Sequence, residues 1–243
     1  MVALNIDGRE IQAEEGTIVL KAATDNNIYI PSMCYAEAVT PYGGCRLCTV
    51  EITTASGQKK LTASCMYPVE EGLKVITTSE RIDRNRRKLM GLMLARCPDS
   101  EVVQEMARSL GVTETQFEKQ EGNNKCILCT LCVRTCQEVV GVSAISLVKQ
   151  SADGQECAPF IRGIPKDCIG CGSCAYVCPT HAITVEESEG RRTISWPHNQ
   201  MKLKLKKCNV CGNYWAPERQ LEYIARISGT SVDDYDICPA CRD

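Results

Sequence analysis

The chain has 243 residues, 18 cysteines and only two phenylalanines, and its formal net charge is −2. So many cysteines beside so few aromatic residues favour several small domains held together by metal over one large apolar core. The small negative charge gives no bulk attraction to nucleic acid. We find no signal-peptide pattern and no apolar run long enough to cross a bilayer, so we expect a cytoplasmic chain without a membrane span.

The first part of the chain predicts a small mixed domain. Val2 to Ile11 alternates apolar and polar residues around Asp7-Gly8, which predicts a β-hairpin. Thr17 is expected to be the N-cap of a helix that buries one apolar stripe. Ile28 to Pro31 then predicts a short strand that leads toward the first cysteine.

Four cysteines follow in this domain, namely Cys34, Cys45, Cys48 and Cys65. The Gly43-Gly44 pair before the second cysteine would let backbone N–H groups approach cluster sulfurs. The spacing is related to that of plant-type ferredoxins but differs from it. Together these features predict a β-grasp domain with one [2Fe–2S] cluster. A zinc site is the alternative, although the ten-residue first gap lies outside usual zinc spacings.

The next segment predicts two helices in a linker. Glu80 to Arg96 forms a helical pattern with a basic first half, and Glu101 to Leu110 predicts an amphipathic helix that ends at Gly111. We expect the basic side chains from Arg81 to Lys88 to lie on a solvated helix face. Docking of an acidic partner is the alternative interpretation of the same charges.

Two runs with the spacing C-x2-C-x2-C-x3-C come next, and the second ends on Cys178-Pro179. Bacterial two-cluster ferredoxins have this ligand run, and the fourth cysteine of each run binds the other cluster. The crossing predicts two [4Fe–4S] clusters, one on Cys126, Cys129, Cys132 and Cys178, and its twin on Cys136, Cys168, Cys171 and Cys174. A disulfide or zinc framework is the alternative, but zinc sites rarely need eight cysteines at this repeat.

The segment between and after these runs carries little further chemistry. Residues 139–150 and 159–165 are expected to supply strands and a turn, and Pro179 is the turn residue after the last ligand. Cys157 has no C-x2-C partner, so we interpret it as a core cysteine rather than a ligand.

The C-terminal part holds two further C-x2-C knuckles, which supply Cys208, Cys211, Cys238 and Cys241. Four thiolates at this separation predict a zinc-ribbon or rubredoxin-like module with Zn²⁺, while a single iron or a third [4Fe–4S] cluster is the alternative. Between the knuckles, residues 217–225 predict a helix with Pro217 in its first turn. The basic cluster from Lys202 to Lys207 lacks an aromatic platform, which favours protein docking over nucleic-acid binding.

Several segments resemble one family. EGTIVLKAA, IPSMCY, YGGCRLCTVEI and LTASCMYPVEEG are similar to the N-terminal domain of the NADH dehydrogenase large iron–sulfur subunit. The same domain occurs in the diaphorase subunits of NAD-linked hydrogenases and in electron-bifurcating complexes. CILCTLCVRTCQEVVG resembles the two-cluster domain that follows it there, so the resemblance extends over about residues 1 to 185.

The chain departs from this family at one cluster. The family binds a further cluster through H-x3-C-x2-C-x5-C, and this chain has Met93, Ser100 and Met106 at three of those positions. Only Cys97 remains, and one thiolate cannot hold a [4Fe–4S] cluster. We therefore expect this cluster to be absent and Cys97 to be a buried free thiol; a ligand completed by a neighbouring subunit is the alternative.

The predicted chain is therefore of the α+β class. It comprises a β-grasp [2Fe–2S] domain over 1–80 and a helical linker over 81–122, which holds the degenerate cluster region of one histidine and three cysteines. A two-[4Fe–4S] ferredoxin domain over 123–187 and a C-terminal four-cysteine module over 188–243 follow.

No dinucleotide fingerprint, P-loop, catalytic triad or HExxH motif is present, so we expect no catalytic residues. The resemblance implies an electron-relay subunit of an NAD(P)H-linked complex, most simply an electron-bifurcating, ferredoxin-coupled transhydrogenase. The implied hetero-oligomer contains an NADH-binding flavoprotein and a further redox subunit, with ferredoxin as another partner. A subunit of an NAD-linked hydrogenase or formate dehydrogenase is the alternative. Two alternatives belong to other functional classes: a free-standing polyferredoxin and an iron–sulfur sensor that binds nucleic acid.

Overall fold

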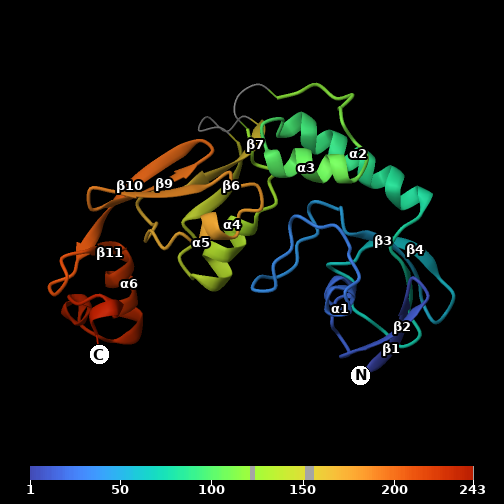
Figure 1. The fold of residues 1–243 in the computed structure, drawn as a ribbon, viewed down its shortest axis with the longest axis horizontal. Helices are drawn as coiled ribbons and strands as arrows, with labels where there is room; N and C mark the ends of the chain where they lie inside the picture. Colours follow the sequence, from blue (N-terminus) through green and yellow to red (C-terminus); the bar gives the residue numbers. More distant parts are fainter. Residues whose placement is uncertain (121–123, 151–155, 243) are drawn as a thin grey trace. The chain divides into compact units, whose positions relative to one another are not determined.

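The chain divides into two compact units, residues 1–129 and 130–243 (Figure 1). The computed structural model describes residues 1–120, 124–150 and 156–242, and for residues 150 and 156–158 it describes the backbone alone. Within these described ranges, no helix is both long and apolar enough to cross a membrane.

The first unit opens with the predicted hairpin. Strand β1 (Val2–Ile6) pairs antiparallel with β2 (Arg9–Ala13), with Val2 opposite Ala13 and Ile6 opposite Arg9. Asp7 and Gly8 make the turn at φ values of 50° and 83°, the left-handed conformation that a tight two-residue hairpin requires. The prediction of this hairpin is confirmed.

The hairpin belongs to a five-stranded mixed sheet in the order β2-β1-β5-β3-β4. The other strands are β3 (Thr49–Thr53), β4 (Lys59–Ala63) and β5 (Lys74–Ile76). Only the β1–β5 pair is parallel. Helix α1 (Val19–Asp25) adds Val19, Leu20, Ala22 and Ala23 to the apolar core of this sheet, so the unit has the predicted α+β construction.

The expected N-cap of α1 at Thr17 is wrong. The following residue occupies the N-cap position, and its side chain makes no capping hydrogen bond. The first N–H groups of the helix instead donate to distant carbonyls, Val19 to Tyr67 at 2.8 Å and Leu20 to Ser64 at 3.0 Å. These tertiary partners replace a side-chain cap, and they attach α1 to the segment around Cys65.

The expected strand over Ile28 to Pro31 is also wrong, because this segment enters no β-ladder. The Ile28 N–H donates to the carbonyl of Ala23 at 2.8 Å, after Asn27 has turned into the left-handed region at φ 57°. The chain here completes the end of a helix, and the apolar residues that suggested a strand pack into the core as loop.

The two linker helices are present as predicted. They are α2 (Glu80–Arg96) and α3 (Glu101–Ser109). The Ser79 hydroxyl accepts the Ile82 N–H at 3.3 Å, and the Ser100 hydroxyl accepts the Val103 N–H at 3.4 Å. These N-caps explain where each helix begins.

The basic first half of α2 differs from the expectation at one residue. Its other basic side chains are exposed, but Arg86 is only 4% exposed. Arg86 lies one turn from Ile82 and one turn from Met90, both fully buried, so it belongs to the apolar stripe of the helix. The prediction of a fully solvated basic face is therefore wrong at Arg86.

The second unit begins with α4 (Leu131–Arg134), which continues as a π-helical turn over Thr135–Val139. Strands β6 (Ile145–Gln150) and β7 (Glu156–Gly163) form an antiparallel pair, and α5 (Ser173–Tyr176) follows. The pair agrees with the strands expected between the two cysteine runs.

A four-stranded antiparallel sheet that was not predicted follows, in the order β11-β10-β9-β8. Its strands are β8 (Thr184–Ser188), β9 (Arg191–Trp196), β10 (Asn199–Lys207) and β11 (Tyr214–Pro217). Met201, Leu203 and Leu205 are buried in β10, while Lys202 and Lys204 between them are exposed. The expected domain boundary at 187/188 falls inside β8, which shares this sheet with the C-terminal strands.

The chain ends with α6 (Glu218–Ser228) and two short 3₁₀ turns, Val232–Tyr235 and Pro239–Cys241. Pro217 was expected in the first turn of this helix, and in the structure it is the N-cap, one position before the first helical residue. Gly229 closes the helix at φ 70°.

Candidate cluster and metal sites

The structure brings the four cysteines of the first domain together in its interior. Their exposed fractions are 1% for Cys34, 5% for Cys45, 0% for Cys48 and 1% for Cys65. Hydrogen bonds from the Cys45 and Cys65 thiols lower the pKa of Cys34, and a bond from Cys65 lowers the pKa of Cys48. Such mutual contacts mean that the four sulfurs surround one small volume, which fits a buried cluster with several thiolate ligands.

The glycine loop before Cys45 supplies backbone donors to this set. The Cys45 N–H donates to the Cys34 sulfur at 3.4 Å, and the Gly44 N–H donates to the same sulfur. Gly43 has φ 66°, and a methyl group there would lie 2.3 Å from the Met66 sulfur. The loop therefore needs glycine both for its conformation and for its close packing, and its N–H groups are aimed at a sulfur that would carry negative charge.

A buried guanidinium lies behind the same loop. Arg86 of α2 donates from Nε to the carbonyl of Leu47 and from Nη2 to the carbonyl of Thr49, both at 3.0 Å. These two carbonyls flank Cys48 in the chain. The burial of Arg86 was not predicted, although its position between Ile82 and Met90 at helical spacing places it on the apolar face of the helix.

The second unit brings together the four cysteines of the crossed set. They line one apolar cavity with Val140, Val142, Ala144, Ile145, Ile169 and Ile194, and they are Cys136, Cys168, Cys171 and Cys174. The Ala144 N–H donates to the Cys136 sulfur at 3.2 Å. Burial raises the pKa of Cys174 to about 12, so metal binding at this site must displace protons from buried thiols.

The two cysteine runs repeat the same backbone conformation at matching positions. In the second run Gly170 and Gly172 have φ values of 83° and 80°. In the first run Leu128 and Thr130 hold the equivalent positions at 55° and 59°. Residues with a side chain rarely adopt these angles, so the ligand loop imposes the conformation on both runs.

The cysteines predicted to bind the other [4Fe–4S] cluster belong partly to the first unit and partly to the second. Cys126 and Cys129 end the first unit, where the Cys126 carbonyl accepts from the Arg96 Nε at 3.3 Å and Cys129 is buried. Cys132 and Cys178 belong to the second unit, where Cys132 is buried in α4 and the Cys178 sulfur accepts the Ala182 N–H at 3.2 Å. Each pair is thus held within its own unit.

The four C-terminal cysteines form the tightest group. The sulfurs of Cys208, Cys211, Cys238 and Cys241 all lie within 4.8 Å of one another, the one such group among the described residues. The Cys211 and Cys238 sulfurs are 3.8 Å apart. A tetrahedral ion with metal–sulfur bonds of about 2.3 Å spaces its sulfurs by about 3.8 Å. This geometry fits a single ion better than a cluster in which each thiolate binds a different iron.

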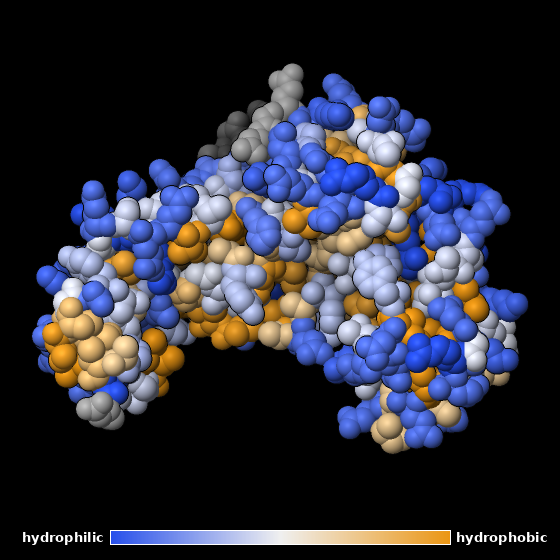
Figure 2. Space-filling view, viewed as in Figure 1, coloured by the Kyte–Doolittle hydropathy of each residue, from blue (hydrophilic) through white to orange (hydrophobic). Residues whose placement is uncertain are grey.

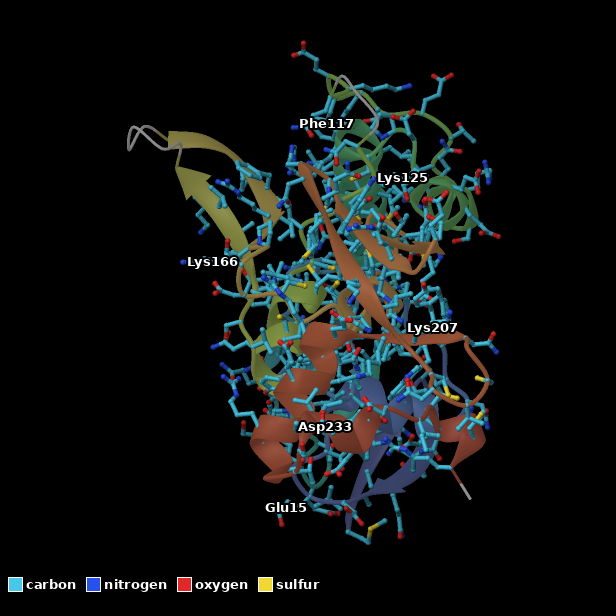
Figure 3. All side chains as sticks on the ribbon, turned by 90° about the vertical axis from the view of Figure 1, so that its left-hand side faces the viewer. Glu15, Phe117, Lys125, Lys166, Lys207 and Asp233 are labelled. Carbon is cyan, nitrogen blue, oxygen red and sulfur yellow. The ribbon has the colours of Figure 1, made fainter. Side chains whose placement is uncertain are left out.

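Backbone donors surround the first sulfur of this group. The Cys208 sulfur accepts N–H groups from Cys238 at 3.3 Å and from Val210 at 3.4 Å, and these bonds lower the pKa of Cys208. In Figure 3 a group of sulfur atoms lies beside the loops of this module, near Lys207 at the end of β10.

The C-terminal module packs on the start of the second cysteine run and on the turn that follows the first run. The Tyr223 hydroxyl of α6 donates to the Val140 carbonyl at 2.8 Å, and Arg219 Nη1 donates to the Pro165 carbonyl at 2.8 Å. The same Arg219 nitrogen donates to the carbonyl of Cys168 at 3.3 Å. No sequence pattern indicated this packing, because it depends on the β8–β11 sheet.

The residues at the degenerate cluster region have other roles. Ser100 is the N-cap of α3 and is 1% exposed. Met106 accepts from the Tyr29 hydroxyl at 4.0 Å. Cys97 is fully buried, as a buried free thiol would be, and this burial raises its pKa to about 12. The side chain of Cys157 lies outside the described residues.

Comparison with known families identifies two domains. Residues 1–80 match the family described as the 2Fe-2S iron-sulfur cluster binding domain, and residues 167–213 match the family described as the 4Fe-4S dicluster domain. The second match does not include the first cysteine run, 126–136. In the structure Cys136 nevertheless lines the cavity of the second run, whereas Cys208 lies with the other C-terminal cysteines. The spatial grouping therefore favours the crossed pairing.

The curated relatives are subunits of NAD(P)-linked oxidoreductases and hydrogenases. NADPH-Fe(3+) oxidoreductase subunit alpha of Geobacter sulfurreducens is 34% identical over 203 residues, which cover 74% of this chain and 24% of that protein. The NADH-quinone oxidoreductase G 2 subunit of Rhizobium meliloti is 30% identical over 75% of this chain and 24% of its own length. NADP-reducing hydrogenase subunit HndD of Solidesulfovibrio fructosivorans is 29% identical over 77% of this chain and 36% of its own. The chain thus spans about a quarter to a third of the length of these relatives.

Among solved structures, a chain of an NAD+-reducing [NiFe]-hydrogenase in the H2-reduced state matches with a TM-score of 0.55 and 28% identity, over 63% of this chain and 77% of that chain. The two matched domains, the relatives and this structure agree with the resemblance seen in the cysteine motifs. The chain therefore contains a 2Fe-2S iron-sulfur cluster binding domain and a 4Fe-4S dicluster domain, and it is homologous to part of the large iron–sulfur subunit of NADH dehydrogenases and of its relatives in NAD(P)-linked hydrogenases.

Proposed function

We propose that this chain is an electron-relay subunit of an NAD(P)H-linked oxidoreductase complex. The observation that carries the proposal is the gathering of buried cysteines into separate sets, each with backbone N–H groups directed at sulfur. The clusters, when bound, would take up and release single electrons. The residues of the chain hold them, exclude water from them and set their surroundings.

The proposed complement is one [2Fe–2S] cluster, two [4Fe–4S] clusters and one Zn²⁺. Cys34, Cys45, Cys48 and Cys65 would hold the first. The crossed cysteine sets would hold the two cubane clusters, and the C-terminal four cysteines would hold the zinc. A 3.8 Å sulfur separation supports a single ion at the last site, and zinc is the first choice for a closed four-thiolate site, with iron as the alternative.

The proposed partners follow from the relatives and from what the sequence lacks. The relatives are named for NADPH, NADH and NADP, and this chain has no dinucleotide fingerprint. Hydride chemistry therefore belongs to a flavin-containing partner, and a further redox subunit exchanges electrons at the other end. We take an electron-bifurcating, ferredoxin-coupled transhydrogenase as the leading assignment.

A subunit of an NAD-linked hydrogenase is the second candidate. It is favoured by the hydrogenase chain among the solved structures and by the NADP-reducing hydrogenase among the relatives. In both candidates the role of this chain is the same, and only the terminal donor or acceptor differs.

Exposed apolar side chains support a subunit over a free-standing carrier. Figure 2 shows apolar surface on the part of the chain that α6 and the C-terminus occupy in Figure 1. The exposed apolar residues of this module are Val210, Tyr214, Ile227, Val232 and Ile237. A free-standing carrier would gain nothing from such a surface, whereas a docked subunit would cover it.

The lysines of β10 support protein docking over nucleic-acid binding. Lys204 pairs with Glu218 at 2.7 Å, and Lys206 pairs with Asp236 at 2.5 Å. These acidic partners reduce the positive potential that phosphate contacts would need.

The proposal is tested by anaerobic purification of a tagged chain from its host at low salt, with flavin analysis and EPR of the product. We expect a complex that contains flavin, and iron–sulfur EPR signals that NADH or NADPH generates in the complex. As the control, the chain purified alone should be reduced by dithionite and not by NAD(P)H. Recovery of a monomer with full cluster content and no flavin partner would contradict the subunit assignment and favour the free-standing carrier.

A further inference from the structure

Arg86 is a charged side chain buried in the interior of the first unit. Its guanidinium is 4% exposed and donates to the carbonyls of Leu47 and Thr49, each at 3.0 Å. It is therefore fixed at two points, both on the loop that carries Cys48. Its neighbour Arg87 is exposed on the same helix.

Among the described residues, no carboxylate lies within 4.0 Å of the Arg86 guanidinium, and Asp83 and Asp7 act on it only at longer range. Two neutral carbonyls satisfy hydrogen bonds but do not neutralise a cation. A buried charge without a counter-charge is strongly unfavourable, so the fold must compensate it in another way.

The cysteine set can supply a compensating charge. Cys48 is fully buried between the two residues whose carbonyls Arg86 binds, so the cysteine set lies beside the guanidinium. Four thiolates around a [2Fe–2S] cluster carry net negative charge, and addition of one electron makes that charge more negative by one unit. A fixed cation beside this set therefore stabilises the reduced form more than the oxidised form.

We propose that Arg86 is the counter-charge of the [2Fe–2S] site, a positioning residue that raises the reduction potential of the cluster. The inference rests on the proposed assignment of this cluster to Cys34, Cys45, Cys48 and Cys65. It also gives α2 a role beyond that of a linker, because the helix carries the charge that sets the redox poise of the first domain.

The test compares Arg86→Gln and Arg86→Lys with the matched control Arg87→Gln in the full chain, by EPR-monitored redox titration with dithionite. At a fixed potential Arg86→Gln should lower the ratio of reduced to oxidised [2Fe–2S] cluster on the order of tenfold, which is about 59 mV for one electron. Arg86→Lys keeps the charge and should stay within about threefold of wild type. Arg87→Gln should leave the ratio unchanged at about 0.15 M salt, because exposed charges are screened.

The outcomes separate the inference from the proposed function. A wild-type chain with no [2Fe–2S] signal would remove the proposed function itself. A normal wild-type signal with equal potentials in Arg86→Gln and Arg87→Gln would overturn the inference alone. If Arg86→Gln binds no cluster, the Arg86→Lys variant decides the question. Cluster binding by Arg86→Lys at the wild-type potential supports the counter-charge. Loss of the cluster in both variants, with both still folded, would make Arg86 a structural hydrogen-bond donor and would overturn the inference.

Discussion

Gly170 provides a quantitative test of how the C-terminal module packs on the second cysteine run. It has φ 83° and lies between Cys168 and Cys171. A methyl group at this position would lie 2.6 Å from a Leu203 methyl carbon and 3.0 Å from the Pro217 ring. Gly170→Ala would therefore add crowding against β10 and β11 to the strain of a left-handed alanine.

Gly172 offers a matched control two residues later in the same loop. Its φ is 80°, and a methyl group there would meet nothing closer than Val185 at 3.7 Å. Gly172→Ala should cost the backbone strain, about 1–2 kcal/mol, without any crowding against β10 and β11. Gly170→Ala should cost the same strain plus overpacking of about 1–3 kcal/mol, which gives about 2–5 kcal/mol in all.

The assay is anaerobic guanidinium denaturation of the cluster-loaded chain, followed by visible cluster absorption and by tryptophan fluorescence. Gly170→Ala should lose the cluster at a clearly lower denaturant concentration than Gly172→Ala, with less iron bound after purification. Equal midpoints for the two variants would refute the packing of β10 and β11 on this loop as the source of the difference.

Three further predictions concern single side chains. Tyr223→Phe removes the hydrogen bond to the Val140 carbonyl and should lower the free energy of unfolding by about 1 kcal/mol in thermal denaturation, with iron content unchanged. Cys97→Ala should leave iron and sulfide at wild-type values; a loss of iron would show that this thiol is a ligand. Because burial raises the pKa of Cys97 from 9.0 to about 12, this thiol should contribute no pH dependence below pH 9 and should lower stability as the pH rises toward 12, a slope that Cys97→Ala abolishes. Cys208→Ser should abolish metal binding at the C-terminal four-cysteine site, measured by metal analysis, while the iron of the clusters stays bound.

The parts of the fold that were predicted well from the sequence are those with local causes. The hairpin at Asp7-Gly8 needs only its turn residues and the alternation of its strands. Helices α2 and α3 begin at serine caps and carry clear apolar stripes. The C-x2-C pairs follow from spacing, because a ligand loop must place two of its sulfurs within a few residues of each other.

The predictions from the sequence were wrong where contacts with distant segments determine the local structure. Thr17 looked like an N-cap, but backbone carbonyls from the other side of the domain take its role. Ile28 to Pro31 had strand composition without a strand to pair with. Arg86 was assigned to solvent with its basic neighbours, although a buried cation becomes favourable when the fold places an anionic site beside it.

The β8–β11 sheet could not be predicted from the sequence because its strands lack a strong signal of their own. Leu203 and Leu205 alternate with lysines in β10, and this pattern was interpreted as a basic cluster before a metal knuckle. The consequence for the candidate sites is direct. The C-terminal cysteine group is attached through this sheet and α6 to Cys168 of the second run and to the turn after the first run, so the two sites belong to one structural unit.

The electron-relay function is tested by metal and sulfide analysis of the purified chain under anaerobic conditions, with EPR of the reduced form. We predict about ten irons, about ten acid-labile sulfides and about one zinc per chain, with signals from one [2Fe–2S] and two [4Fe–4S] clusters. One extra iron without extra sulfide would change only the metal of the C-terminal site. Zinc in excess, with little iron and no cluster EPR signal, would contradict the electron-relay function.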